Sequence, residues 1–271
     1  MMRPLSIAHL TLLELAPPEL IRIAALAGFS SVGLRLISVT DTTPGYPLMD
    51  DPQMMRDTLK VMEETGITVN DIEFVRLTPE FDTKAFTGFL EAGAKLRAKY
   101  IVTAPYDPDL ERLTDNLAAF AVHASGFGLK PVLEFFPWTN VPDFQSALRI
   151  VENTGDRSVG VLLDTLHFDR SGSSLSDLVA ADPARLPFIH LCDAAVQASY
   201  SNEELLHTAR AARLIPGQGS IKLSEILALL PVDIPIVLEV PIEGRFGLGS
   251  TKVARSAFEF SQAFLTKVTC S

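Results

Sequence analysis

Four short apolar segments of this chain each contain one residue that can bind a metal ion or transfer a proton. The segments are Pro131–Pro137, Val161–His167, Phe188–Asp193 and Ile236–Pro241, and the residues are Glu134, Asp164, His190 and Glu239. Short apolar runs of this kind are typical of buried parallel strands. A charged group at the end of a buried strand is energetically costly unless it is paired or bound to a cation. Four adjacent strand ends that meet around one metal ion account for all four residues.

Three carboxylates and one imidazole form an oxygen-rich ligand set. Such a set suits Mn²⁺, Mg²⁺ or Co²⁺ better than a closed structural zinc site, although it also fits catalytic Zn²⁺. A divalent ion can polarise a carbonyl and stabilise the enediolate that forms when the neighbouring carbon loses its proton. Glu134 and Glu239, on opposite sides of the substrate, would act as base and acid. We therefore predict one divalent metal ion and two catalytic glutamates.

The chain as a whole alternates between strand and helix patterns, with eight such units and no linker between them. A strict alternation implies a parallel sheet, and eight units imply closure into a barrel. We predict a single (β/α)8 TIM barrel, an α/β fold, over residues 1–271. An open doubly wound sheet is the alternative, but no glycine-rich phosphate turn follows the first predicted strand. In the barrel, the four strand ends would face one common mouth.

The predicted elements follow from apolar runs, helix caps and the proline and glycine residues that punctuate them. The predicted strands are Leu5–His9, Ser31–Leu36, Thr68–Phe74, Tyr100–Thr103, Pro131–Glu134, Val159–Asp164, Phe188–Leu191 and Ile236–Glu239. The predicted helices are Pro17–Ala27, Gln53–Thr65, Phe81–Lys99, Leu110–Phe127, Asp143–Asn153, Ser174–Ala181, Glu203–Ala212, Leu223–Leu230 and Ser250–Phe264. The longest insertion follows the seventh strand and contains the turn Pro216–Gly219.

Composition narrows the classes of function. The 271 residues carry a net charge of −10, with a pI near 5.0, which disfavours binding to nucleic acid. The two cysteines, Cys192 and Cys270, provide no disulfide framework, which fits a reducing compartment. No apolar run approaches the ~18 residues of a membrane span, and polar residues interrupt the N-terminal apolar stretch. We expect a cytoplasmic protein that binds a small polar substrate, without a membrane partner, and that could form a homo-oligomer.

Three residues close to the predicted ligands have more than one interpretation. His167 follows Asp164 by three residues and would either contact substrate or cap a helix. Asp193 would either contact one of the metal ligands without binding the metal itself, or cap a loop. Cys192 is most simply a small residue that fills the core.

The motifs LEFFP, LLDTLH, FIHLCDA, RLIPGQGSI and LEVP together resemble the sugar isomerase/epimerase superfamily with a xylose isomerase-like barrel. The resemblance extends over the whole chain and is concentrated in residues 131–241. Among the small members, the chain looks closest to ketose 3-epimerases, hydroxypyruvate isomerase, inosose dehydratase and 3-dehydroshikimate dehydratase. These motifs are specific for the superfamily and much less so for the reaction.

The resemblance implies roles for individual residues. The metal ligands of the family fall on Glu134, Asp164, His190 and Glu239, and its Asp-x-x-His motif implies a substrate contact by His167. The segment before the Pro-Gly-x-Gly turn implies that Arg213 contacts an anion or a hydroxyl group. At the same mouth, the substrate could also contact a first group of residues, near the ends of the first, second and eighth strands. A second group, of aromatic or polar loop residues, would shape the pocket. The first group is His9, Arg35, Glu243 and Arg245, and the second is Trp138, Asn140 and Phe246.

Three functions remain open on these residues. The first is a metal-dependent isomerase or epimerase of a ketose or related hydroxy-ketone, with proton transfer through an enediolate between two glutamates. The second is a lyase or dehydratase on the same scaffold, acting on an inosose, 3-dehydroshikimate or a 3-keto-glycoside. The third is a sugar-binding barrel without turnover. The superfamily also contains apurinic endonucleases with three metals, but these need further histidine ligands, and only five histidines occur here.

Overall fold

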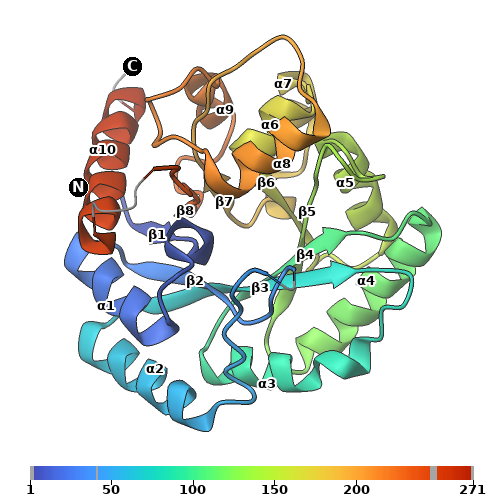
Figure 1. Cartoon of the computed structure of the whole chain (residues 1–271). Coiled ribbons are helices and arrows are strands. Elements are labelled where there is room, and N and C mark those ends of the chain that lie inside the picture. Colours follow the sequence, from blue (N-terminus) through green and yellow to red (C-terminus); the bar gives the residue numbers. More distant parts are fainter. Residues whose placement is uncertain (1–2, 41, 245–248, 270–271) are drawn as a thin grey trace.

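The strands of this protein close into a barrel, as the computed structural model shows for residues 3–40, 42–244 and 249–269 (Figure 1). The strands pair in parallel and in chain order, and β8 pairs with β1. They are β1 Leu5–Ile7, β2 Ser31–Arg35, β3 Thr68–Leu77, β4 Tyr100–Pro105, β5 Lys130–Glu134, β6 Gly160–Asp164, β7 Ile189–Leu191 and β8 Ile236–Leu238. The predicted α/β barrel is therefore confirmed.

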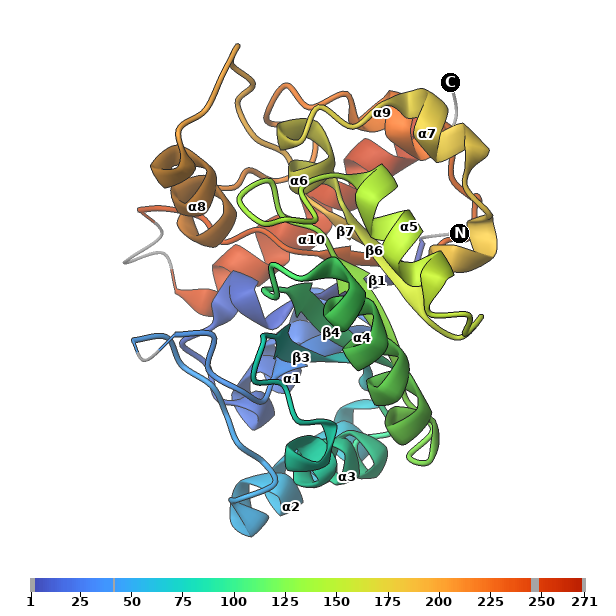
Figure 2. The ribbon, with the colours of Figure 1, turned by 90° about the vertical axis from the view of Figure 1, so that its right-hand side faces the viewer.

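Helices surround the barrel, and none in the described ranges is long and apolar enough to cross a membrane (Figures 1 and 2). The α-helices are α1 Pro17–Ala27, α2 Pro52–Thr65, α3 Thr87–Lys95, α4 Leu110–Ser125, α5 Phe144–Asn153, α6 Thr165–Arg170, α7 Leu175–Ala180, α8 Asn202–Ala211, α9 Leu223–Ala228 and α10 Ser250–Thr269. Short 3-10 helices are η1 His9–Leu12, η2 Thr83–Phe86 and η3 Pro183–Arg185. In Figure 2, α8 and the connection after β2 lie on the same side of the barrel.

Local sequence explains several of these boundaries. Asp143 and Ser146 form a reciprocal capping box that starts α5, in which each side chain bonds to the other's backbone N–H. Pro17 opens α1, and Gly28 ends it in the left-handed conformation that a side chain disfavours. These caps fix where each helix turns back toward the sheet, and so they fix where the next strand begins.

The alternation of side chains along the strands places the polar strand ends inside the barrel. Successive strand residues point to opposite faces, so residues two apart share a face. Val132, Leu162, Phe188 and Val237 belong to one buried apolar cluster, and each precedes a predicted metal ligand by two residues. The four predicted ligands therefore stand directly above an apolar floor, at the carboxyl end of the barrel.

The structure corrects several predicted boundaries. The segment after Asp164 was predicted to be a loop, but it forms the helix α6 between β6 and α7. The predicted helix Phe81–Lys99 is divided into η2 and α3, with residues 81–82 and 96–99 outside both. β3 runs three residues further than predicted, to Leu77, because the apolar residues Val75 and Leu77 are buried beside β4. Apart from the missed helix α6, these errors lie at element ends, where burial in the folded protein decides the boundary.

Candidate metal centre and substrate cavity

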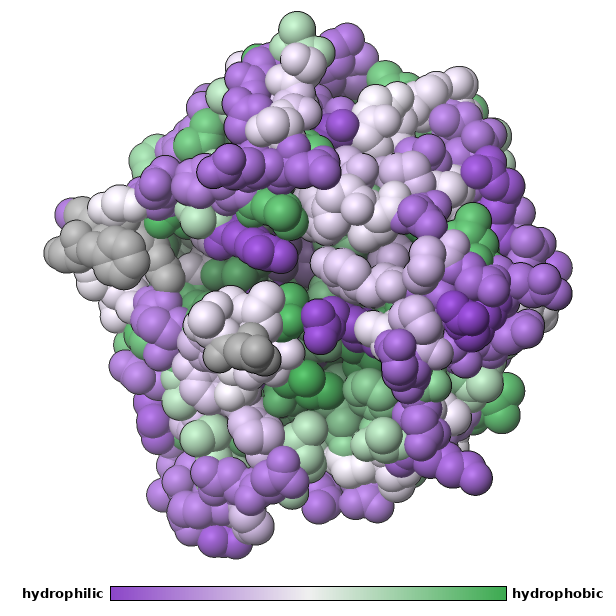
Figure 3. Space-filling model, turned by 45° about the vertical axis from the view of Figure 1, so that its right-hand side comes forward, coloured by the Kyte–Doolittle hydropathy of each residue, from purple (hydrophilic) through white to green (hydrophobic). Residues whose placement is uncertain are grey.

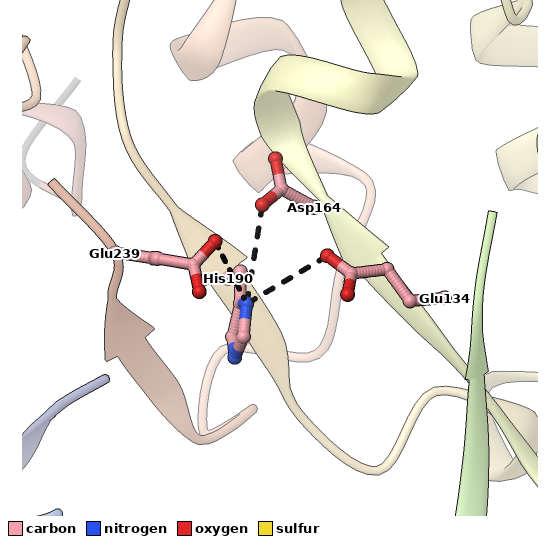
Figure 4. Close-up of side chains that lie close together, drawn as sticks. All are labelled: Glu134, Asp164, His190 and Glu239. Carbon is pink, nitrogen blue, oxygen red and sulfur yellow. Dashed lines mark ion pairs between the residues drawn. The ribbon is translucent and has the colours of Figure 1, made fainter. Parts of the chain in front are cut away.

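Four side chains from neighbouring strands converge at the carboxyl end of the barrel (Figure 4). Glu134 ends β5, Asp164 ends β6, His190 lies in β7 and Glu239 directly follows β8. All four are buried, and one ligand atom from each lies within 4.8 Å of the others. Asp164 and His190 are direct partners in the β6–β7 register, which brings their side chains to the same level.

The distances around His190 suit a shared cation. Its Nδ1 atom lies 3.5 Å from Glu239 Oε2, 3.9 Å from Glu134 Oε1 and 3.9 Å from Asp164 Oδ2. Two ligands on one divalent ion, each at about 2.0–2.2 Å, lie roughly 3–4 Å apart. Neither ring nitrogen of His190 makes a hydrogen bond within the described residues, although buried polar atoms normally have a partner. The geometry and the donor atoms therefore fit a divalent metal ion.

Asp164 has two separate tasks. Its Oδ1 atom caps α6 and accepts hydrogen bonds from the backbone N–H groups of Leu166, at 2.7 Å, and His167, at 3.3 Å. Its Oδ2 atom faces the cluster. An aspartate followed by a short helix is thus oriented by the helix it caps, and the same turn sets the position of the third helical residue, His167. This arrangement explains the Asp-x-x-His spacing, and His167 lies within the helix and does not cap it.

His167 presents a neutral imidazole to the cavity. Its Nε2 atom lies 3.8 Å from Glu134 Oε1, and its ring packs edge-on against Phe136 and Trp138. Burial, together with the charge of Arg213, lowers the pKa of His167 to about 4 and outweighs the carboxylate of Asp164. Its Nδ1 atom has no hydrogen-bond partner within the described ranges. A neutral ring of this kind can bind a substrate oxygen.

Arg213 supplies a buried positive charge to the cluster. Its Nη1 atom donates to Asp164 Oδ2 at 2.5 Å, and its Nη2 atom lies 2.7 Å from Glu239 Oε2. The neighbouring Leu214 forms an antiparallel bridge with Asp193. The Asp193 carboxylate accepts backbone N–H groups of the following turn, at Gly217, Gly219 and Ile221. Asp193 therefore acts as a loop cap that holds Arg213 in place, in agreement with one of its two predicted roles.

The two glutamates have opposite electrostatic environments. Burial and the negative charge of Glu239 raise the pKa of Glu134 well above its ordinary value. Burial alone would raise the pKa of Glu239 as well, but Arg213 and His190 hold it well below the ordinary value. Burial lowers the pKa of His190, yet the three carboxylates outweigh it and raise that pKa to about 10. In the metal-free protein, the pKa values of the two glutamates are therefore shifted in opposite directions.

The cluster opens onto a cavity of about 140 Å³. Pockets for drug-sized ligands have about 300–1,000 Å³, so this one suits a small molecule. Figure 3 shows a recess near the centre of this side of the molecule, where apolar and strongly hydrophilic residues lie together. Besides Glu134, Glu239, His167 and Arg213, the lining includes an aromatic wall and an ion pair. The wall consists of Phe74, Tyr106, Phe136 and Trp138, and the pair of Arg35 and Glu73.

His9 does not line this cavity. It is fully buried, and its Nδ1 atom accepts the backbone N–H of Arg35 at 2.9 Å. Its Nε2 atom lies 2.9 Å from the carbonyl oxygen of Leu15, so Nε2 carries the proton and donates it there. The ring also stacks on Tyr46, with 5.1 Å between centroids. Both ring nitrogens are committed to the backbone, so we remove His9 from the expected substrate contacts.

The remaining predicted residues divide by position. Trp138 and Arg35 line the cavity. Asn140 donates to the carbonyl of Pro108 at 3.0 Å, and Glu243 is exposed at the surface beside His207. The predictions for Arg245 and Phe246 fall outside the described residues.

The sequence analysis missed several residues of the lining, among them Glu73 and Tyr106. Glu73 lies in β3 and faces the cavity, as does Tyr106 directly after β4. Asp71 and Glu73 lie two apart in a strand whose other residues are mostly apolar, so both carboxylates share the inner face. That spacing was the available signal for Glu73. Tyr106 had no comparable signal.

Comparison with known proteins identifies relatives and structural neighbours. A family model described as a xylose isomerase-like TIM barrel matches residues 21–264. A curated inosose isomerase of Halalkalibacterium halodurans is 30% identical over 156 residues, covering 54% of this chain and 53% of that protein. An inosose isomerase of Bacillus subtilis is 28% identical over 155 residues, covering 54% of each. The chain thus matches about half the length of these curated relatives.

Solved structures share the fold across nearly the whole chain. The IOLI protein with a bound zinc atom has a TM-score of 0.76 at 22% identity, covering 99% of this chain and 98% of that one. D-Psicose 3-epimerase from Clostridium cellulolyticum H10 with D-tagatose has a TM-score of 0.73 at 18% identity, covering 98% and 99%. A probable 3-DHS dehydratase, AsbF from Bacillus anthracis, has a TM-score of 0.72 at 13% identity, covering 94% and 97%. At these identities, the likeness extends to the fold alone.

Proposed function

The chain belongs to the xylose isomerase-like TIM barrel family, and from this we propose that it is a divalent-metal-dependent isomerase or epimerase of a ketose or keto-polyol. The observation that carries the proposal is the pair of buried glutamates, Glu134 and Glu239, which flank His190 at the floor of one small cavity. Two carboxylates in opposite electrostatic environments are what a proton transfer with return of the proton requires.

Glu134, Asp164, His190 and Glu239 would hold the metal ion. When bound, the ion would supply Lewis-acid polarisation of the substrate carbonyl and compensate negative charge. The IOLI structure, which shares this fold and contains a bound zinc atom, supports a divalent ion. The oxygen-rich donor set leaves Mn²⁺, Mg²⁺, Co²⁺ and Zn²⁺ as candidates.

The chain's own side chains would transfer the proton. One glutamate removes a proton from the carbon beside the carbonyl, and the other returns a proton to the neighbouring position or to the opposite face. Arg213 pairs with Glu239 and stabilises its ionised form, which suits Glu239 as the base, and Glu134, on the other side of His190, would return the proton. The neutral ring of His167, which lines the cavity, would bind a substrate oxygen, and Arg213 would hold Asp164 and Glu239 in place.

The relatives support this class of reaction. The curated proteins with the stated matches are inosose isomerases, whose substrate by name is a cyclic keto-polyol. The D-psicose 3-epimerase neighbour acts on ketoses within the same fold. The aromatic side chains of the cavity lining offer apolar faces to a polyol ring, and they are Phe74, Tyr106, Phe136 and Trp138.

Solvent isotope exchange tests the proposal. We expect the metal-loaded protein to incorporate deuterium from D₂O into a ketose or an inosose, detected by mass spectrometry without loss of water. Glu134→Gln and Glu239→Gln should each lower this exchange by about 10²–10⁴-fold, because glutamine cannot take up or release the proton. Glu243→Gln, an exposed glutamate outside the cavity, is the matched control and should retain full exchange.

Metal content must be measured for each variant. Glutamine keeps one oxygen ligand, so we expect the metal to stay bound while the exchange is lost. Retained exchange in both cavity variants would refute the assignment of the two glutamates. Loss of water from the substrate, seen as a product lighter by one water molecule, would instead identify a dehydratase.

A further inference from the structure

A buried ion pair lies on the opposite side of the cavity from the metal cluster. Arg35 and Glu73 are direct partners in the β2–β3 register, and Arg35 Nη2 lies 3.2 Å from Glu73 Oε1. Their side chains are only 7% and 2% exposed, and both line the cavity. In a closed ring of eight strands in chain order, β2 and β3 stand across from β6 and β7, which carry Asp164 and His190.

The pair retains hydrogen-bonding capacity. Arg35 Nε donates no hydrogen bond and Glu73 Oε1 accepts none within the described part of the chain. Buried polar atoms are rarely left in this state without a functional reason, because each missing bond costs free energy. Both atoms are buried and both residues line the cavity, so an unused donor and an unused acceptor of one ion pair lie next to the cavity.

A hydroxyl group matches this arrangement, because it donates one hydrogen bond and accepts others. Two neighbouring hydroxyls can satisfy both atoms, one by accepting from Arg35 and one by donating to Glu73. Phe74 lies beneath the Arg35 guanidinium, 5.9 Å from its ring centroid, and contacts Phe136 at 6.0 Å. These rings offer an apolar surface for the carbon skeleton between the hydroxyls.

The charge balance of the cavity disfavours an anion. Glu73 neutralises Arg35, and Asp164 and Glu239 already hold Arg213. Arg210, at the rim, is exposed, so that water and salt screen its charge. At the Arg35–Glu73 end of the cavity, away from the proposed metal ion, a phosphate or carboxylate on the substrate would therefore lose its hydration without gaining an unpaired buried cation among the described lining residues.

We propose that the Arg35–Glu73 pair binds two hydroxyl groups at the end of the substrate remote from the metal cluster, and selects an uncharged polyol over an anionic analogue. This inference depends on the proposed function for the cavity being the substrate site. It adds Glu73 as a specificity-determining residue and an uncharged keto-polyol as the substrate class.

Calorimetric binding of two matched, unreactive probes tests the proposal. The probes are myo-inositol, an uncharged cyclic polyol, and quinate, a cyclic polyol that carries a carboxylate. The wild-type protein should bind myo-inositol at least about 10-fold more tightly than quinate. Glu73→Gln should weaken myo-inositol binding by about 10–100-fold, the range for a hydrogen bond to a charged group. The same variant should strengthen quinate binding, because Arg35 then lacks its counter-charge.

A second variant removes the risk that an unpaired Arg35 disturbs folding. The double variant Arg35→Gln with Glu73→Gln removes both charges and leaves neither of them unpaired. It should lose myo-inositol binding without any gain for quinate, while its unfolding transition stays cooperative. Glu243→Gln, with an exposed side chain, is the control and should bind both probes as the wild type does.

The proposal is overturned if the wild type prefers quinate, if it binds neither probe, or if both variants leave the ratio of the two affinities unchanged. Its failure is distinguishable from failure of the proposed function, because neither probe needs turnover. Exchange activity with an unchanged affinity ratio would refute only the role of the pair. A shifted ratio in a protein without exchange would refute only the isomerase assignment.

Discussion

The two halves of the barrel mouth solve the problem of buried charge in different ways. On β5–β8, three carboxylates and a histidine gather with Arg213 as their cationic partner, and the His190 nitrogens have no hydrogen-bond partner among the residues that the structure describes. On β1–β3, His9 is bonded to the backbone and Arg35 is neutralised by its neighbour Glu73. The first half is built to receive a cation, and the second is built to stay neutral. A substrate between them would have its reactive end at the cation and its hydroxyls at the neutral wall.

The largest effect should come from substituting Asp164, in the β5–β8 half of the barrel mouth. Asp164→Ala removes one metal ligand and also leaves Arg213 buried without that partner, which costs about 3–5 kcal/mol. Metal analysis and denaturant unfolding should show a loss of bound metal together with this loss of stability.

Asp143→Ala is the matched control, because Asp143 is also an aspartate that caps a helix. Loss of a cap alone costs about 0.5–2 kcal/mol, and metal binding should be unchanged. Equal effects of the two substitutions would mean that Asp164 is only a cap.

The same half should show a marked dependence of metal affinity on pH. At neutral pH the pKa of His190, raised to about 10, leaves a proton on this proposed ligand, which a metal must displace, and the raised pKa of Glu134 adds to the competition between protons and metal. Affinity for Mn²⁺ should therefore rise with pH, by up to about tenfold per pH unit for each proton released. Competition titrations between pH 6 and 8.5 measure this slope.

The metal-free protein should respond in the opposite direction. The pKa of His190 is higher in the folded state, about 10, than its ordinary 6.5. Its contribution to stability is therefore complete below pH 6.5 and is lost as the pH rises through 10. An affinity for Mn²⁺ that does not change between pH 6 and 8.5 would contradict the electrostatics described for the cluster.

A smaller effect should come from His9 in the neutral half. His9→Gln removes two buried hydrogen bonds to the backbone and the stacking on Tyr46, for an expected loss of about 1–3 kcal/mol. Metal affinity should not change. Chemical denaturation and metal titration of the same sample give both values.

His9 also sets an acid limb of stability. Burial lowers its pKa to about 4 in the folded protein, so its contribution is present above pH 6.5 and is lost as the pH falls through 4. The variant should lose stability less steeply than the wild type between pH 6.5 and 4. Parallel stability curves would show that the imidazole is not held neutral by the fold.

The two halves also differ in how well the sequence predicted them. The ligand half could be predicted because each residue closes its own apolar strand, and strand order then brings the residues together. The neutral half could not, because Arg35 and Glu73 become partners only through the β2–β3 register, which strand patterns leave open. His9 was misplaced for a related reason, since its nitrogens meet backbone groups of Leu15 and Arg35 that only the folded chain brings near. The helix after Asp164 was missed because it has only six residues, which is about one and a half turns.

Anomalous diffraction from a crystal soaked with Mn²⁺ tests the central claim most directly. We predict one strong peak per chain at the barrel mouth, with Glu134, Asp164, His190 and Glu239 each about 2.0–2.3 Å from it. A mouth without a peak at saturating metal, or a peak bound by other residues, would contradict the account.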